Sequence, residues 1–60
     1  DALIGREGRE EEAIAPGESG YVAVDGDVWE AVSRETDVIE VGEKVKIVDR
    51  KSLIVTVERI

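Results

Sequence analysis

The stretch Gly20–Ser33 predicts a β-hairpin, and it constrains the fold more than any other part of the chain. Asp25-Gly26 separates two apolar runs, and a type I′ turn needs positive φ at both central residues, which Asp and Gly tolerate. Whether the turn uses residues 25 and 26 or 26 and 27, even positions before it pair with odd positions after it. One face of the hairpin, with the only tryptophan near its middle, therefore carries Val22, Val24, Trp29 and Ala31.

Three more strands are predicted around this hairpin. Gly8 to Ile14 is a first, poorly patterned edge strand, and Pro16 begins a glycine-rich turn after it. Residues 43–49 and 53–58 form the last two strands, in which apolar and polar residues alternate. Residues 34–42 are too few for a helix with its loops, so we expect this connection to pack Ile39 or Val41 over one barrel end.

A shared core follows from these strand faces. Lys44 and Lys46 point outward, which turns their apolar neighbours inward, and the last strand is predicted to turn its odd-numbered residues inward. The predicted core, besides Ile39 or Val41, consists of Val22, Val24, Trp29, Ala31, Val45, Ile47, Leu53, Val55 and Val57.

Five strands with one apolar face each favour closure into a small barrel, because open edges invite aggregation. We therefore predict an all-β, OB-fold-like five-stranded barrel with little or no helix, formed by residues 8–60 and preceded by an entry or linker end at 1–7. Val and Ile far outnumber Leu, which agrees with strands. The chain begins at Asp1 without a Met, which predicts a longer parent protein.

The residues that carry common chemistry are scarce, so we expect no catalytic residue, metal or cofactor. The chain has no His and no Cys, which removes the usual general base and a zinc-thiolate site. A Lys51-Ser52 dyad would need two turn neighbours to converge, and Asp25-Gly26-Asp27 lacks the remaining ligands of a calcium loop. The run Arg9-Glu10-Glu11-Glu12 is interpreted as a solvated face.

Binding of single-stranded nucleic acid, or of another small ligand, is the alternative that an OB-fold-like barrel suggests. A net charge of −7 opposes it, because phosphate backbones are repelled. Tyr21 and Trp29 point to opposite faces and form no stacking platform. The basic residues that could line one side of the barrel are Arg34, Lys44, Lys46, Arg50 and Lys51.

The order of motifs resembles the C-terminal soluble domain of NfeD-type proteins over nearly the whole chain. The most specific motif is Val22-x-Val24-Asp25-Gly26-x-x-Trp29-x-Ala31, followed by the weaker Gly42-x-x-Val45-x-Ile47. The charged first strand and a longer loop after Pro16 depart from the family pattern. The resemblance implies a non-catalytic protein-interaction module, attached to a membrane protein at the inner or plasma membrane but not itself inserted, that acts with a stomatin- or prohibitin-like partner. Longer relatives carry a serine protease domain, which no residue of this chain matches.

The predicted outer faces carry apolar side chains that are candidates for contact with a partner. These are Tyr21, Val28, Val32 and Ile54. The alternative is that they cover one another or pack beneath the first strand and its loop. The absence of Asn, Gln, Cys, Met and His, with 38% charged residues, is also typical of proteins from hot environments.

Overall fold

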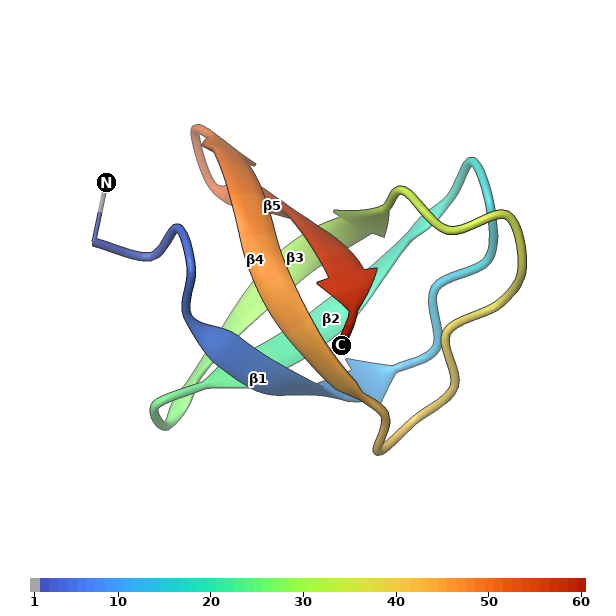
Figure 1. The fold of residues 1–60 in the computed structure, drawn as a ribbon, viewed down its shortest axis with the longest axis horizontal. Coiled ribbons are helices and arrows are strands. Elements are labelled where there is room, and N and C mark those ends of the chain that lie inside the picture. Colours follow the sequence, from blue (N-terminus) through green and yellow to red (C-terminus); the bar gives the residue numbers. More distant parts are fainter. Residues whose placement is uncertain (1) are drawn as a thin grey trace.

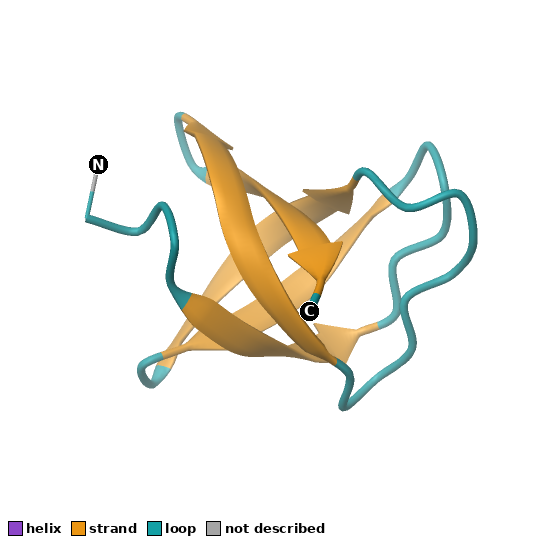
Figure 2. Cartoon of the chain, in the orientation of Figure 1, coloured by secondary structure: helices purple, strands orange, loops and turns teal. Residues whose placement is uncertain are grey.

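The computed structural model describes residues 2–60, which form a closed barrel of five strands (Figure 1). The strands are β1 (Glu7–Glu12), β2 (Ser19–Val24), β3 (Asp27–Ser33), β4 (Lys44–Lys51) and β5 (Ile54–Arg59). Their order around the barrel is β1-β2-β3-β5-β4, and β4 pairs with β1 to close it. Among the strand pairs within residues 2–60, only β3 and β5 pair in parallel. Residues 2–60 contain no helix (Figure 2), so the predicted all-β barrel is confirmed.

The hairpin of β2 and β3 has the predicted turn and register. Asp25 and Gly26 adopt φ of 50° and 85°, as a type I′ turn requires. Val22 lies opposite Trp29, and Gly20 lies opposite Ala31. Opposed residues project to the same side of a sheet, so this register places the apolar residues of both strands on the inner face.

β1 lacks a clear apolar pattern because its inward positions carry unusual residues. It spans Glu7–Glu12 rather than Gly8 to Ile14. At Gly8 an added Cβ would lie 2.4 Å from the carbonyl oxygen of Ala23, so only glycine fits where β1 passes close to the backbone of β2. The next inward position is Glu10, and a β-bulge between Glu10 and Glu12 then turns Glu12 outward.

The long connections on either side of the hairpin meet at one end of the barrel. Ile14, after β1, forms a two-way backbone bridge to Ile39, with N···O distances of 3.0 Å in both directions. The segments around these two residues lie side by side in Figure 1. Both side chains are fully buried, so the connection between β3 and β4 covers this end of the barrel, as expected for Ile39.

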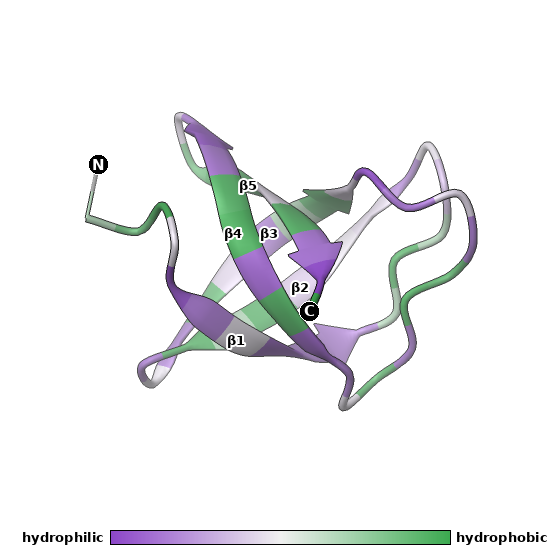
Figure 3. Ribbon diagram, in the orientation of Figure 1, coloured by the Kyte–Doolittle hydropathy of each residue, from purple (hydrophilic) through white to green (hydrophobic). Residues whose placement is uncertain are grey.

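The core contains nine buried apolar residues, and bands of apolar and polar residues alternate along β4 (Figure 3). Its members are Ile14, Val22, Val24, Ala31, Ile39, Val45, Ile47, Val55 and Val57. The prediction for Leu53 was wrong, since this residue is 70% exposed. Lys51 pairs with Ile54, so Leu53 belongs to a two-residue turn, where strand alternation does not apply.

Two other core expectations also need correction. Trp29 is only partly buried and packs against the core from its margin, rather than at its centre. Val41 is exposed, whereas Ile39 in the same connection is buried. Of the predicted entry at 1–7, residue 1 lies outside the described residues, and Gly5 and Arg6 hydrogen-bond to Ile47 of β4.

Candidate interaction surface

The outer side of β2, β3 and β5 carries a row of side chains whose order follows from the strand registers. Glu12 lies opposite Tyr21, Tyr21 opposite Glu30, and Glu30 opposite Ile54. Lys51 of β4 ends the row beside Ile54. Neighbouring Cβ atoms in such a row are about 5 Å apart, so acidic and apolar side chains alternate in contact range.

Four exposed apolar residues on this side make up what we call the apolar face. Tyr21 is 42% exposed, Val28 58%, Leu53 70% and Ile54 38%. Three of them were predicted as contact candidates, and the structure adds Leu53. The fourth candidate, Val32, is also on the outer side but is partly covered between Ser19 and Thr56.

A hollow of about 410 Å³ lies at the edge of the apolar face and is lined by residues 27–30 and Leu53. It forms because the pairing of β3 with β5 begins only at Glu30, so that residues 27–29 extend past the start of β5. The Arg50 guanidinium lies 5.0 Å from the centroid of the Trp29 ring, a cation–π contact. Arg50 lies opposite the buried Val55, which directs it toward this end of the barrel.

Three carboxylates lie in or beside the apolar face, and we call them the acidic rim: Glu12 and Glu30 in the row, and Asp27, which lies opposite Val24 at the barrel end and lines the hollow. Among residues 2–60, none of the three takes part in an ion pair. Some carboxylates elsewhere do pair, as Glu7 does with Lys44 and Asp25 with Arg6, whereas Glu11, Glu18, Glu40 and Asp49 have no ion pair within residues 2–60 either. The outer side of β2, β3 and β5 and the adjacent hollow therefore combine exposed apolar surface with carboxylates that form no ion pair within residues 2–60.

The predicted basic side of the barrel is not a continuous cationic groove. Arg34 lies 3.9 Å from Glu58, and Lys44 lies 3.5 Å from Glu7. Arg50 covers Trp29, and Lys46 and Lys51 lie near opposite ends of β4. The positive charges are thus dispersed or compensated, so they do not form a continuous cationic groove that could bind a phosphate backbone.

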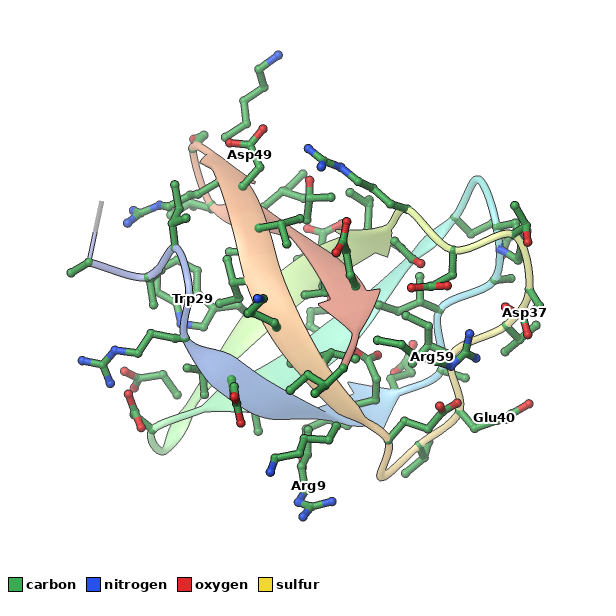
Figure 4. The ribbon with its side chains drawn as sticks, in the orientation of Figure 1. Arg9, Trp29, Asp37, Glu40, Asp49 and Arg59 are labelled. Carbon is green, nitrogen blue, oxygen red and sulfur yellow. The ribbon has the colours of Figure 1, made fainter. Side chains whose placement is uncertain are left out.

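Arg59 makes several contacts at the end of the barrel opposite the hollow and Trp29 (Figure 4). Its Nε donates to Glu43 at 2.8 Å, its Nη1 to Asp37 at 2.8 Å, and its Nη2 to the carbonyl oxygen of Val38 at 2.7 Å. Its backbone N–H donates to Glu35 at 2.9 Å. One side chain therefore fastens the connection between β3 and β4 to the end of β5.

These contacts also shift the ionisation of the residues involved. The hydrogen bond from Arg59 lowers the pKa of Glu43, and the backbone N–H of Glu40 adds to this effect at 2.8 Å. Hydrogen bonds to Glu43 and Asp37 raise the pKa of Arg59. The sequence carried a signal for this cluster, because Arg59 continues the inward alternation of Val55 and Val57.

Glu10 is the largest departure from the sequence prediction at this end. It was interpreted as part of a solvated face, but it is 2% exposed, and neither carboxylate oxygen has a hydrogen-bond partner in the described structure. Its backbone bonds to Glu43 and Gly42 hold β1 against the start of β4. Burial, with the nearby Glu43 charge, raises the pKa of Glu10 to about 7.

A metal centre does not follow from these carboxylates. No group of three or more acidic residues among residues 2–60 converges as a metal site would require. Arg59 already occupies the position between Glu35, Asp37 and Glu43.

Comparison with known proteins identifies the family. Residues 1–59 match the model of the NfeD-like C-terminal, partner-binding domain. The chain belongs to the NfeD family. This family is described as partner-binding, so the NfeD domain seen here is a protein-interaction module, as the sequence predicted.

Solved NfeD domains share the barrel. The C-terminal domain of stomatin operon partner protein 1510-C from Pyrococcus horikoshii is 37% identical, with a TM-score of 0.89, and the match covers 98% of this chain and 89% of that one. The soluble domain of a membrane protein implicated in regulation of membrane protease activity from Corynebacterium glutamicum is 32% identical, with a TM-score of 0.84 and coverage of 93% and 89%. The soluble domain of the NfeD protein YuaF from Bacillus subtilis is 28% identical, with a TM-score of 0.88 and coverage of 98% and 75%.

The curated proteins contain no significant match to the chain. Within residues 2–60, no helix has the length and apolar character needed to cross a bilayer.

Proposed function

We propose that this chain is the non-catalytic docking module of a membrane-anchored NfeD protein, and that the protein it binds is of the stomatin type. The observation that carries the proposal is the 37% identity, over 98% of the chain, to the C-terminal domain of a stomatin operon partner protein. The family description supports a binding role, and a neighbour at 32% identity is the soluble domain of a membrane protein.

The geometry supports docking on the outer side of β2, β3 and β5. The nine core residues fill the barrel interior, so a macromolecular partner must use the outside. The apolar face places exposed apolar side chains on neighbouring strands, with Glu30 between Tyr21 and Ile54, and apolar surface patches commonly mark interfaces.

The proposal is tested by co-purification of this chain with the stomatin-type protein from the same organism. Tyr21→Lys and Val28→Lys should each abolish or strongly reduce recovery of that protein. Val41→Lys is the matched control, because Val41 is 65% exposed but lies in the connection between β3 and β4. If the intact chain recovers no stomatin-type protein while the whole parent protein does, the docking module lies elsewhere in the parent.

A further inference from the structure

The chemistry of a partner can be read from the charges around the apolar face. The acidic rim comes from two strands: Glu12 on β1, and Glu30 and Asp27 on β3, where Glu30 lies between Tyr21 of β2 and Ile54 of β5. Lys51 is the one basic side chain in the row, at its β4 end, and the Arg50 guanidinium lies over the Trp29 ring beside the hollow. Since the rim carboxylates have no ion-pair partner within residues 2–60, their charge acts on whatever approaches.

This arrangement argues against three classes of occupant. A second copy docked through the same face would bring two acidic rims together, which costs free energy. A phosphate backbone or an anionic membrane surface would meet the same repulsion, added to a net charge of −7. A positively charged protein segment is the class of occupant whose binding the rim carboxylates would favour.

The hollow defines what such a segment must carry besides charge. Val28, Trp29 and Leu53 contribute apolar surface to its wall, while Asp27 and Glu30 supply carboxylates to the same lining. A volume of about 410 Å³ is at the lower end of the size of small-ligand pockets, and can receive one or two aliphatic or aromatic side chains. Basic residues beside such an anchor would reach Asp27 and Glu30.

We propose that the apolar face and its acidic rim bind a partner segment that presents apolar anchor side chains flanked by lysine or arginine. This inference rests on the proposed function and specifies the chemistry of the partner. The anchor occupies the hollow beside Leu53, and the flanking cations pair with Glu30 and Asp27. Charge pairing of this kind sets selectivity and association rate, while burial of the anchor supplies most of the affinity.

Two synthetic peptides of equal length, one alternating Leu with Lys and the other Leu with Glu, test this chemistry on the ¹⁵N-labelled chain. The Leu/Lys peptide should shift the amide resonances of Tyr21, Val28, Leu53 and Ile54, and its Kd should rise with salt. The Leu/Glu peptide should leave them unchanged. Equal binding of the two peptides, or shifts confined to the Arg59 end of the barrel, would overturn the inference.

Variants of the rim make the test specific. Glu30→Lys should weaken the Leu/Lys peptide at least tenfold, and Glu30→Gln should weaken it less. Glu18→Lys is the matched control, because Glu18 is exposed in the loop between β1 and β2 and makes the same change in net charge. An equal loss in Glu30→Lys and Glu18→Lys would mean that only overall charge matters, which contradicts the inference.

The same variants, used with the stomatin-type protein, separate this inference from the proposed function. If the peptide binds as expected but the stomatin-type protein does not, the chemistry of the face stands and the proposed partner is wrong. If the stomatin-type protein binds and Glu30→Lys has no effect, the proposed function stands and the inference is overturned. Concentration-dependent dimers that Glu30→Lys strengthens would also overturn it, since the face would then bind a second copy.

Discussion

Replacing Glu10 by glutamine should change how the stability of this barrel depends on pH. The carboxyl group is 2% exposed and has no hydrogen-bond partner among residues 2–60. Ionisation at this position therefore places a charge in the barrel interior without compensation, and the nearby Glu43 adds repulsion. Glutamine keeps the shape of the side chain and cannot ionise.

The size of the effect follows from the pKa. In the folded chain the pKa of Glu10 is raised from 4.5 to about 7. Each unit corresponds to about 1.4 kcal/mol, so the two states differ by about 3 kcal/mol in their cost of ionisation. Between pH 4.5 and 7 the folded state holds the proton and the unfolded state does not, so stability falls as pH rises through this window.

Glu43 titrates with the opposite sign. Its pKa is lowered by Arg59, so its contribution is present above its usual pKa and is lost as pH falls through the lowered value. The stability contributed by Glu43 is therefore lost at acid pH, whereas the stability contributed by protonated Glu10 is lost toward neutral pH. Because the two pH ranges differ, a dome-shaped profile of stability against pH is expected.

Urea unfolding of both proteins from pH 5 to pH 8 measures the effect. The stability of Glu10→Gln relative to the natural chain should improve by about 2.5 kcal/mol across this range, which covers most of the window between the two pKa values, whatever constant cost the amide adds. Glu11→Gln, an exposed neighbour, should show no such trend. Parallel pH profiles for Glu10→Gln and the natural chain would refute the reasoning, because they would mean that Glu10 ionises normally in the folded state.

Three other predictions concern the core, the Arg59 contacts and thermal stability. Ile47→Ala should cost about 2–5 kcal/mol in urea unfolding, whereas Leu53→Ala should change stability by less than about 0.5 kcal/mol, and similar losses would contradict the burial assigned to the two residues. Arg59→Ala should speed amide hydrogen exchange at Ile39 much more than Arg34→Ala does, because Arg59 binds the connection that contains Ile39. Equal exchange rates at Ile39 in the two variants would show that the Arg59 contacts do not stabilise this connection. The composition predicts a thermal midpoint above about 65 °C, and a value within the mesophilic range of about 45–65 °C would oppose it.

The hairpin and the alternating strands could be predicted because their signals are local. Asp25-Gly26 specifies a turn type by backbone conformation alone, and that turn sets the register of Val22 against Trp29. In β4, alternation is clear where Val45 and Ile47 are inward. Local rules of this kind were enough to predict a closed barrel of five strands, whereas the strand order and the parallel pairing of β3 with β5 came only from the structure.

The remaining features depend on contacts between distant parts of the chain. The inward positions of β1 hold Gly8 and Glu10 instead of apolar residues, so the sequence shows no alternating pattern there. The bulge after Glu10 breaks the alternation further. Leu53 escapes the pattern because Ser52 adopts φ of 58° in a turn without Gly or Asn to signal it. The acidic rim could not be predicted, because whether a carboxylate forms an ion pair depends on which cations the fold places near it.

Chemical-shift mapping of the ¹⁵N-labelled chain with the stomatin-type protein from the same organism tests the central claim most directly. The account predicts that signals of Tyr21, Val28, Glu30 and Ile54 shift or broaden first, while Arg59 and Val41 at the opposite end stay unchanged. A response centred on Arg59 and the connection between β3 and β4, or no response at a saturating concentration of the partner, would contradict it.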